Sequence, residues 1–440
     1  MAALDLDALY AARPSGGPDW LAAARTEGWE RFGRLGLPTP KLESWKYTNL
    51  APLQKIALFA APAGDDAAAR PLVAEAARAF PDAHRVVLVN GRFAPGLSEI
   101  GALPVGARLG TLIGGVGLLP GLADDEGVAR QFAGHAEGES RALVGLNAAL
   151  ATDGLVLRVR AGVAVERPIH LVSVTLAGDG AVSASRHLVH VEAGGSATLI
   201  EHHIGLHAGT AVANVVVDAR VEAGATLHHY KIQAEAAGTI HLATTLVHLE
   251  EGAVYDNFAL SHGARLARNE IAATIAAPEV ECRLNGAYII GGTQHCDTTT
   301  FIDHAAPRTA SREVYKGVLD DTARGVFQGK IRVRQAAQKT DGYQLNRALL
   351  LSQGAEIDSK PELEIFADDV KCSHGATAGE LSEDQLFYLR ARGIDRDTAR
   401  GLLIGAFVAE ALEEVRVESV REGMMGIVSA RLGRDLREAA

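Results

Sequence analysis

A turn-forming tetrad recurs at nearly constant intervals through the middle of the sequence, and this repeat restricts the fold more than any other feature. Three tetrads end at Gly194, Gly224 and Gly252, and a related one ends at Pro278. The unit therefore recurs roughly every 30 residues, with intervals that shorten slightly along the chain. Short runs of Val, Ile, Leu and Thr fill these intervals. Strand-rich units with such a period predict a solenoid in which each coil stacks on the previous one.

Residues 155–330 contain no stretch with a helical period, so the sequence predicts an all-β solenoid, a parallel β-helix. The 47 glycines support this interpretation, because each coil must turn corners where φ is often positive and glycine has no Cβ to clash. The alternative is a β-sandwich with irregularly spaced hairpins, although such folds seldom show so long a repeat. We expect a mainly β chain whose β-helix core occupies residues 151–378.

A mixed and largely helical domain is expected before the core, in residues 1–150. Apolar residues among charges indicate a helix over residues 19–35, and an Ala-rich stretch indicates another over residues 61–80. Residues 85–93 form a predicted strand that enters an Asn-Gly turn. Residues 94–140 are rich in Gly and Leu without a clear period, and we expect loops and short elements there.

A second helical domain is expected after the core, in residues 379–440. Ser382 and Gln385 form a capping box, and Gly393 ends the short helix that follows. Asp395 can cap a second helix. The predicted apolar face of this second helix comprises Ala399, Leu403, Phe407 and Ala411. The hairpin is either a cap that closes the solenoid or a docking module.

Charge and cysteine content exclude several classes of function. The chain has 43 Lys+Arg against 54 Asp+Glu, and this net charge of −11 argues against nucleic acid as a partner because phosphate binding needs clustered basic residues. Three Cys cannot make a disulfide framework, and residues 1–10 lack the basic start and apolar run of a signal peptide. No apolar stretch approaches the roughly 20 residues that cross a bilayer. We therefore expect a cytoplasmic protein without nucleic-acid or membrane partners.

Cys372 and His374 bring Cys and His close together in the sequence. In a strand, residues two apart point to the same face and lie roughly 7 Å apart, at a rise of about 3.3 Å per residue. A thiolate and an imidazole on one face can bind iron or zinc, or can form a nucleophile pair if a third group orients them. A lone Cys is also commonly a small buried hydrophobe. Two ligands do not complete a metal site, so the others would have to come from another chain.

The other two thiols, Cys282 and Cys296, are well separated in the sequence, which has no CxxC motif. This arrangement excludes a four-Cys cluster within the chain and favours buried or incidental thiols.

Two double histidines, residues 202–203 and 228–229, are about one coil apart. Aligning their flanking residues places Glu201 over His229, which weakens the case for a metal-binding histidine ladder. We expect polar side chains on the outer face of the β-helix here.

Common enzyme motifs for phosphate binding, dinucleotide binding and hydrolysis are absent from the sequence. A polysaccharide-active β-helix would line a groove with carboxylates, but nothing in the sequence groups Asp297, Asp303, Asp320 and Asp321. We predict no catalytic residues.

Three segments resemble the SufB/SufD family, which assembles iron–sulfur clusters in the SUF system. Residues 40–48 (PKLESWKYT) and 369–377 (DVKCSHGAT) look like the amino- and carboxy-terminal signatures of its SufD branch. Residues 382–394 (SEDQLFYLRARGI) and the helix after them match the family generally. The likeness covers nearly the whole chain, and the Ala-rich segment of residues 61–80 is its least typical part.

The resemblance implies a right-handed parallel β-helix flanked by helical domains. It also implies a non-enzymatic scaffold that pairs with the paralogue SufB and binds two copies of the SufC ATPase, in a complex associated with reduced flavin. A nascent iron–sulfur cluster or iron would lie at the SufB–SufD interface, with Cys372 and His374 among its ligands and the remaining ligands supplied by SufB.

In this interpretation the hairpin of residues 382–415 docks SufC. The expected contact residues are Leu386, Phe387, Leu403 and Phe407. The isolated chain could form a homodimer in place of the SufB pairing. Two alternatives stay open: a structural subunit needed for complex assembly or iron entry without supplying cluster ligands, and a polysaccharide-active β-helix enzyme.

Overall fold

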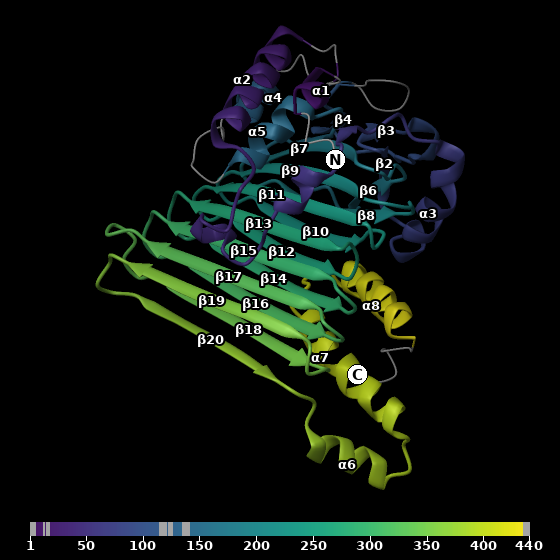
Figure 1. The fold of residues 1–440 in the computed structure, drawn as a ribbon. Helices are drawn as coiled ribbons and strands as arrows, with labels where there is room; N and C mark the ends of the chain where they lie inside the picture. The colour runs from purple at the N-terminus through teal and green to yellow at the C-terminus, as the bar shows by residue number, and fades with distance from the viewer. Residues whose placement is uncertain are drawn as a thin grey trace.

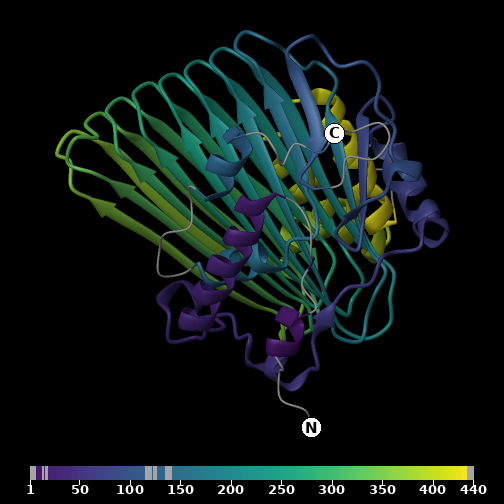
Figure 2. The ribbon, with the colours of Figure 1, turned by 90° about the horizontal axis from the view of Figure 1, so that it is seen from above.

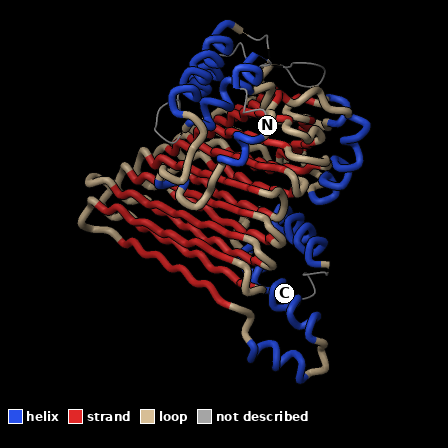
Figure 3. The backbone as a smooth tube through the Cα atoms, in the orientation of Figure 1, coloured by secondary structure: helices blue, strands red, loops and turns tan. Residues whose placement is uncertain are grey.

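The computed structural model is a parallel β-helix with helices packed along its flanks (Figure 1, Figure 2). The structure describes residues 6–11, 14, 18–113, 121, 126–133 and 141–433. Figure 3 shows the strands as one continuous stack with the helices outside it. The prediction of a mainly β chain built on a β-helix is confirmed.

Two ten-stranded sheets form the walls of the β-helix in the described part of the chain. Sheet A contains β1 (Phe59–Ala60), β4 (Ala107–Thr111), β5 (Leu155–Val159), β7 (Ala181–Val191), β9 (Ala211–Val221), β11 (Thr239–Leu249), β13 (Leu266–Ile275), β15 (His295–His304), β17 (Arg324–Val333) and β19 (Glu356–Ile365). Sheet B contains β2 (His84–Val89), β3 (Arg92–Phe93), β6 (Ile169–Thr175), β8 (Ser196–Gly205), β10 (Thr226–Ala234), β12 (Val254–Ser261), β14 (Glu281–Ile290), β16 (Ala310–Leu319), β18 (Asp341–Leu350) and β20 (Lys371–Gly379). Strands of successive coils pair in parallel, from β5 with β7 to β18 with β20. Two short strands pair antiparallel instead, β3 with β2 and β4 with β5.

The predicted turn tetrads form the corners of successive coils. Thr226 of β10 lies in register with Ser196 of β8 and with Val254 of β12, so each step to the next coil advances by one repeat. Gly194, Gly224 and Gly252 have φ values of 66°, 64° and 65°, which a side chain would disfavour. The fourth corner places a non-glycine residue, Glu279, at positive φ (60°).

The interior of the coils has an apolar half and a polar half. Val191, Val221 and Leu249 of sheet A pack with Leu199 and Leu227 of sheet B, and all are fully buried. Each such side chain contributes about 1.5–3 kcal/mol to stability. Farther along the same strands, the side chains that point into the interior are polar. These buried residues are Glu201, His203, His229, Lys231, Gln233 and His241.

The amino-terminal helices cover one end of the β-helix (Figure 1). They are α1 (Leu6–Ala11), α2 (Asp19–Leu35), α3 (Asp66–Ala79), α4 (Glu126–Ala133) and α5 (Ala142–Leu150), with 3-10 turns at Glu43–Trp45, Ala51–Lys55 and Pro95–Leu97. Helix α5 packs on β7 and β9, α2 packs on α5, and α3 packs on β6 and β8.

Three amino-terminal predictions are confirmed. The helices expected over residues 19–35 and 61–80 are α2 and α3. The expected Asn-Gly turn joins β2 to β3, with φ values of 49° at Asn90 and 77° at Gly91. The expectation of loops and short elements over residues 94–140 falls partly outside the described residues, and the described part includes β4 and α4.

Three helices follow the last strand: α6 (Glu383–Ala391), α7 (Arg396–Leu412) and α8 (Glu418–Leu432). Both predicted caps are present, since the Ser382 side chain accepts from the N–H of Gln385 (3.3 Å) and Asp395 accepts from that of Thr398 (2.9 Å). Helix α7 packs on the outer face of β14 and β16, and α8 lies beside α3. None of the described helices has the length and apolar character needed to span a membrane.

The predicted apolar face of α7 needs correction. Its buried residues are Ala399, Ile404, Gly405, Val408, Ala411 and Leu412. Leu403 and Phe407 lie at the edge of this face and are half-buried. The face was misplaced because a strict interval of four residues drifts around a helix that has about 3.6 residues per turn.

Candidate functional site

Cys372 and His374 lie on β20, the last strand of sheet B. Strand β20 pairs with β18 on one side, and no described strand covers its other edge. Cys372 is half-buried and packs against the apolar interior of the last coils, whereas His374 is exposed. Because residues two apart share a strand face, both side chains are directed toward the interior at the open end of the β-helix.

Burial raises the pKa of the Cys372 thiol above its usual range, although the backbone N–H of Gly342 acts in the opposite direction. The thiol is therefore protonated at neutral pH, and a metal bound there must displace its proton. Cys282 and Cys296 are fully buried as predicted, and burial raises the pKa of Cys296 to about 12. These two thiols are inert at neutral pH.

A ladder of polar side chains leads inward from His374. Glu313 on β16, Gln344 on β18 and His374 on β20 are in register. Gln344 Nε2 donates to Glu313 Oε2 (2.6 Å), and both side chains are fully buried. Burial raises the pKa of Glu313 to about 7, although the hydrogen bond from Gln344 acts in the opposite direction.

This ladder places a carboxyl that titrates near neutral pH two strands away from the exposed imidazole. Perturbed groups of this kind cluster at functional sites. Sequence reasoning missed it, although the spacing from Glu313 to Gln344 and the spacing from Gln344 to His374 each match one coil.

The end of the β-helix beyond β19 and β20 is open (Figure 1). The N–H of Lys371 donates to the carbonyl of Thr340 in the β18 layer. By alternation, the N–H groups of Cys372, His374 and Ala376 point to the free edge. This edge carries one charged residue, Lys371, in a strand of otherwise small or polar side chains. An edge with so little protection is a template for pairing with another chain.

The predicted docking residues lie in different environments. Phe387 on α6 is 75% exposed, and the neighbouring Tyr388, which the prediction omitted, is 54% exposed. Leu386 is 6% exposed and packs inward. On α7, Leu403 and Phe407 are half-buried.

Phe407 contacts the body of the β-helix. The Lys316 ammonium lies 5.0 Å and the Arg347 guanidinium 5.8 Å from its ring centre, in cation–π geometry. Helix α6, in contrast, extends beyond the end of the β-helix (Figure 1). Its exposed aromatic pair is the more accessible part of the predicted docking surface.

The double histidines are divided between the two faces of sheet B, so the prediction of an outer face is only partly right. His203 and His229 share the alternation of Leu199 and Leu227 and are buried in the interior. His202 and His228 point outward, where His202 is buried at the groove between α3 and α8 and His228 is half-buried. The coil from β8 to β10 is longer than the alignment of the sequence assumed, so His229 lies in register with Leu199 and not with Glu201. Glu201 still reaches His229 along the interior, with 2.7 Å between its Oε1 and Nε2 of the ring.

The amino-terminal signature fixes its segment on the outer face of sheet A. The Arg268 guanidinium lies 3.9 Å from the centre of the Trp45 ring and forms an ion pair with Asp297, and all three side chains are buried. Arg268 also donates to the carbonyl of Ser44 (2.8 Å), and the Thr48 hydroxyl donates to Asp297. These contacts give the signature a structural role on β13 and β15.

The carboxylates considered for a polysaccharide-active groove are used separately. Asp297 pairs with Arg268, while Asp303 pairs with Arg334 (2.6 Å). Asp320 lies in the turn after β16 and contacts Arg400 of α7 (3.5 Å). This arrangement does not favour general acid–base catalysis by paired carboxylates.

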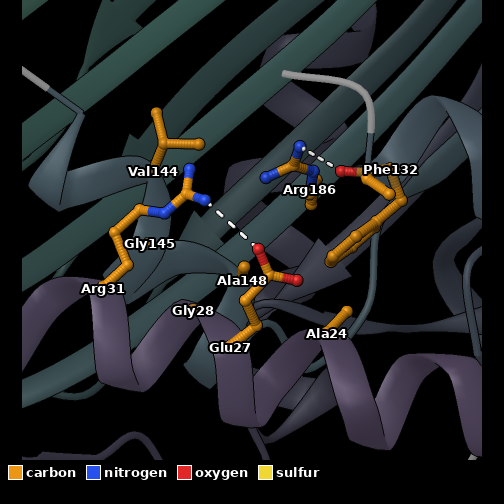
Figure 4. Close-up of a pocket in the computed structure, with 10 residues that line it drawn as sticks. Ala24, Glu27, Gly28, Arg31, Phe132, Val144, Gly145, Ala148 and Arg186 are labelled. Atoms are coloured by element: carbon orange, nitrogen blue, oxygen red, sulfur yellow. Dashed lines mark hydrogen bonds and ion pairs between the residues drawn. The ribbon is translucent and has the colours of Figure 1, made fainter. Parts of the chain in front are cut away.

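A small cavity of about 40 Å³ lies between α2, α4 and α5 (Figure 4). The two helices α2 and α5 approach closely because Gly28 faces Gly145, and a Cβ on Gly28 would lie 2.6 Å from the carbonyl oxygen of Gly145. Arg186 at the wall donates to the carbonyl of Phe132 (3.0 Å). This cavity is a packing feature, too small for a substrate. A wider groove of about 900 Å³ between α3 and α8 is lined by charges of both signs.

Comparison with known families matches almost the whole chain. Residues 14–171 match the SufBD protein N-terminal region, and residues 174–407 match the SufBD core domain of SUF system FeS cluster assembly. The chain belongs to the SufB/SufD family. The SufBD core match extends into α7 and includes Cys372 and His374.

Individual relatives agree with the SufB/SufD assignment. The iron–sulfur cluster assembly protein SufD of Escherichia coli is 33% identical over 402 residues, covering 91% of this chain and 90% of the relative. An iron–sulfur cluster assembly SufBD family protein of Synechocystis is 32% identical and covers 95% of this chain and 92% of the relative. The chloroplastic protein ABCI7 of Arabidopsis thaliana is 36% identical over 63% of this chain and 60% of its own length. The chain is a SufD-like member of an iron–sulfur cluster assembly family.

Proposed function

We propose that this chain is a non-enzymatic cytoplasmic scaffold subunit that contributes Cys372 and His374 to an iron–sulfur cluster or iron site shared with a SufB subunit. The observation that carries the proposal is the placement of a half-buried thiol and an exposed imidazole on one face of an edge strand that no other described strand covers. A thiolate and an imidazole suit iron, and two ligands leave coordination positions for groups from a partner.

The open end formed by β19 and β20 is the surface through which the chain would pair with SufB. An Ala376→Pro substitution tests this pairing, because it removes an N–H that points to the free edge and leaves the β18 ladder intact. We expect the variant to lose co-purification with SufB, while Ala376→Ser, which keeps the N–H, retains it. Full recovery of SufB with the proline variant would contradict pairing at this edge. The same pair of variants tests whether the isolated chain forms a homodimer there.

The α6–α7 hairpin would dock the SufC ATPase, with exposed Phe387 as its anchor. Phe387→Asp should abolish co-purification with SufC and leave the circular dichroism spectrum unchanged, because the side chain is exposed. Gln385→Asp places the same charge on the same helix and should retain SufC. Retention of SufC by the Phe387 variant would show that the docking surface lies elsewhere. Half-buried Phe407 is a poorer probe, since its loss also disturbs the contact with Lys316.

The second candidate function is a structural subunit that supports assembly or iron entry without supplying cluster ligands. Cys372 favours this interpretation in one respect, since its side chain packs against the apolar interior. A Cys372→Ser complex that assembles normally but forms no cluster would argue against it. Reduced flavin stays an expectation of the family resemblance, and none of the described residues is assigned to it.

A further inference from the structure

His203, Glu235 and His241 form a buried group of metal-ligating residues inside the coil, far from the open end. One ligand atom from each of the three side chains lies within 4.8 Å of the others. His203 lies near the end of β8, Glu235 follows β10, and His241 lies near the start of β11. Five coil steps separate β10 from β20, which is about 24 Å at a strand spacing of about 4.8 Å. The group is therefore separate from Cys372 and His374.

Hydrogen bonding leaves part of this group without protein partners. His241 Nδ1 is paired with Glu235 Oε2 (2.8 Å), but the other ring nitrogen, Nε2, has no hydrogen-bond partner among the described residues. The Oε1 of the adjacent buried Gln233 is also unpartnered there. Buried polar atoms are rarely left in this state, and a bound ion is a recognised explanation. These atoms provide evidence for a ligand that is independent of the residue types.

The buried charged side chains around the group suit a cation. Two carboxylates, Glu201 and Glu235, are buried there together with a single ammonium group, that of Lys231.

Glu201 orients His203 as carboxylates orient metal-binding histidines elsewhere. Glu201 Oε2 accepts from Nε2 of His203 (3.1 Å), which leaves Nδ1 as the nitrogen that can face an ion. His229 differs, because Glu201 accepts from its Nε2 and Tyr255 donates to its Nδ1 (2.8 Å). The hydrogen bonds thus leave His203 available as a ligand, whereas both ring nitrogens of His229 already have partners.

We propose that His203, Glu235 and His241 bind a divalent transition-metal ion, Fe²⁺ or Zn²⁺, inside the β-helix. Two imidazoles and one carboxylate are a donor set used by both ions. Bonds of about 2.1 Å in tetrahedral geometry put ligand atoms about 3.4 Å apart, which small rotations of these side chains reach. Glu235 lies next to the partly exposed turn of residues 236–238, which gives an ion a short route inward.

The test uses the full chain in a Cys372→Ser, His374→Ala background, so that metal at the open end does not contribute. Chelator-treated protein is titrated without oxygen with Fe²⁺ or Zn²⁺, and bound metal is measured by mass spectrometry. Co²⁺ serves as a spectroscopic probe of the ligand set. We expect about one ion per chain, an absorption spectrum of nitrogen and oxygen ligation, and a raised melting temperature on metal addition.

Glu235→Gln and His241→Gln should each weaken Co²⁺ binding at least tenfold. His187→Gln is the matched control, because His187 is buried in the same interior but both its nitrogens already have partners. Absence of stoichiometric metal in the background chain, or equal binding by the Glu235 and control variants, would overturn the proposal. The background measurement decides the matter even if a ligand variant fails to fold. The inference does not rest on the proposed function, since it needs neither SufB nor SufC.

Discussion

The buried carboxyl of Glu313 gives a prediction whose size follows from its surroundings. Burial raises its pKa from 4.5 to about 7 in the folded chain. The folded state thus binds this proton more tightly than the unfolded state, and protonation favours folding. The contribution to stability is present at low pH and is lost as pH rises from about 4.5 through 7.

The magnitude follows from linkage. A shift of about 2.5 units at about 1.4 kcal/mol per unit is a total of about 3 kcal/mol, of which about 2 kcal/mol falls between pH 5 and pH 8. Glu313→Gln keeps the shape of the side chain and its hydrogen bond to Gln344 but removes the titration. We therefore expect the variant to gain about 2 kcal/mol on the wild type between pH 5 and pH 8.

Urea denaturation of both chains at pH 5, 6, 7 and 8 measures this difference, because all other titrating groups are shared. Unchanged m-values would show that the unfolded states are comparable. Parallel stability curves for the two chains across this range would refute the assigned environment of Glu313. The polar ladder beneath His374 would then not contain a carboxyl whose pKa is raised by burial.

Two further predictions concern the frame that holds the site, and a third concerns metal binding at Cys372. Asp297→Asn neutralises one of the two carboxylates paired with the buried Arg268 guanidinium, leaving it only Glu270 (3.2 Å), and should cost about 1.5–3 kcal/mol in urea denaturation; a loss below about 0.5 kcal/mol would contradict the anchoring role of the amino-terminal signature. Gly224→Ala meets no steric obstacle but forces alanine into positive φ, and should lower stability by about 1–2 kcal/mol, whereas an unchanged midpoint would contradict the corner geometry. Metal affinity at Cys372 should rise up to about tenfold per pH unit below the thiol pKa, as read by competition with a chelator, and a flat profile would argue against thiolate ligation.

Local chemistry explains why much of the fold was predictable. Gly194, Gly224 and Gly252 mark corners because the turn requires positive φ at a single residue. Ser382 and Asp395 mark helix starts because each side chain accepts from an N–H three residues ahead. The pairing of Cys372 with His374 on one face follows from strand alternation alone.

The polar interior was not predictable by the same means. Helices α3, α7 and α8 cover sheet B, so both faces of β8 and β10 are buried, and their alternation gives no contrast between solvent and core. The sequence did contain one signal. Glu201 and His203 lie two and four residues after Leu199, so their side chains point to the same interior face as Leu199. Contact between His203 and His241 also depends on coil lengths, which the sequence indicates only to within a few residues.

The central claim is that His374 holds iron or a nascent cluster at the open end. The most direct test co-expresses this chain with the proposed partners SufB and SufC and measures iron, sulfide and cluster absorbance on the purified complex, comparing His374→Ala with Ser373→Ala. Ser373 is exposed on the opposite face of the same strand, which makes it a matched control. We predict that the His374 variant assembles the complex but loses the cluster, while the Ser373 variant keeps both. An unchanged cluster yield on the His374→Ala complex would contradict the account.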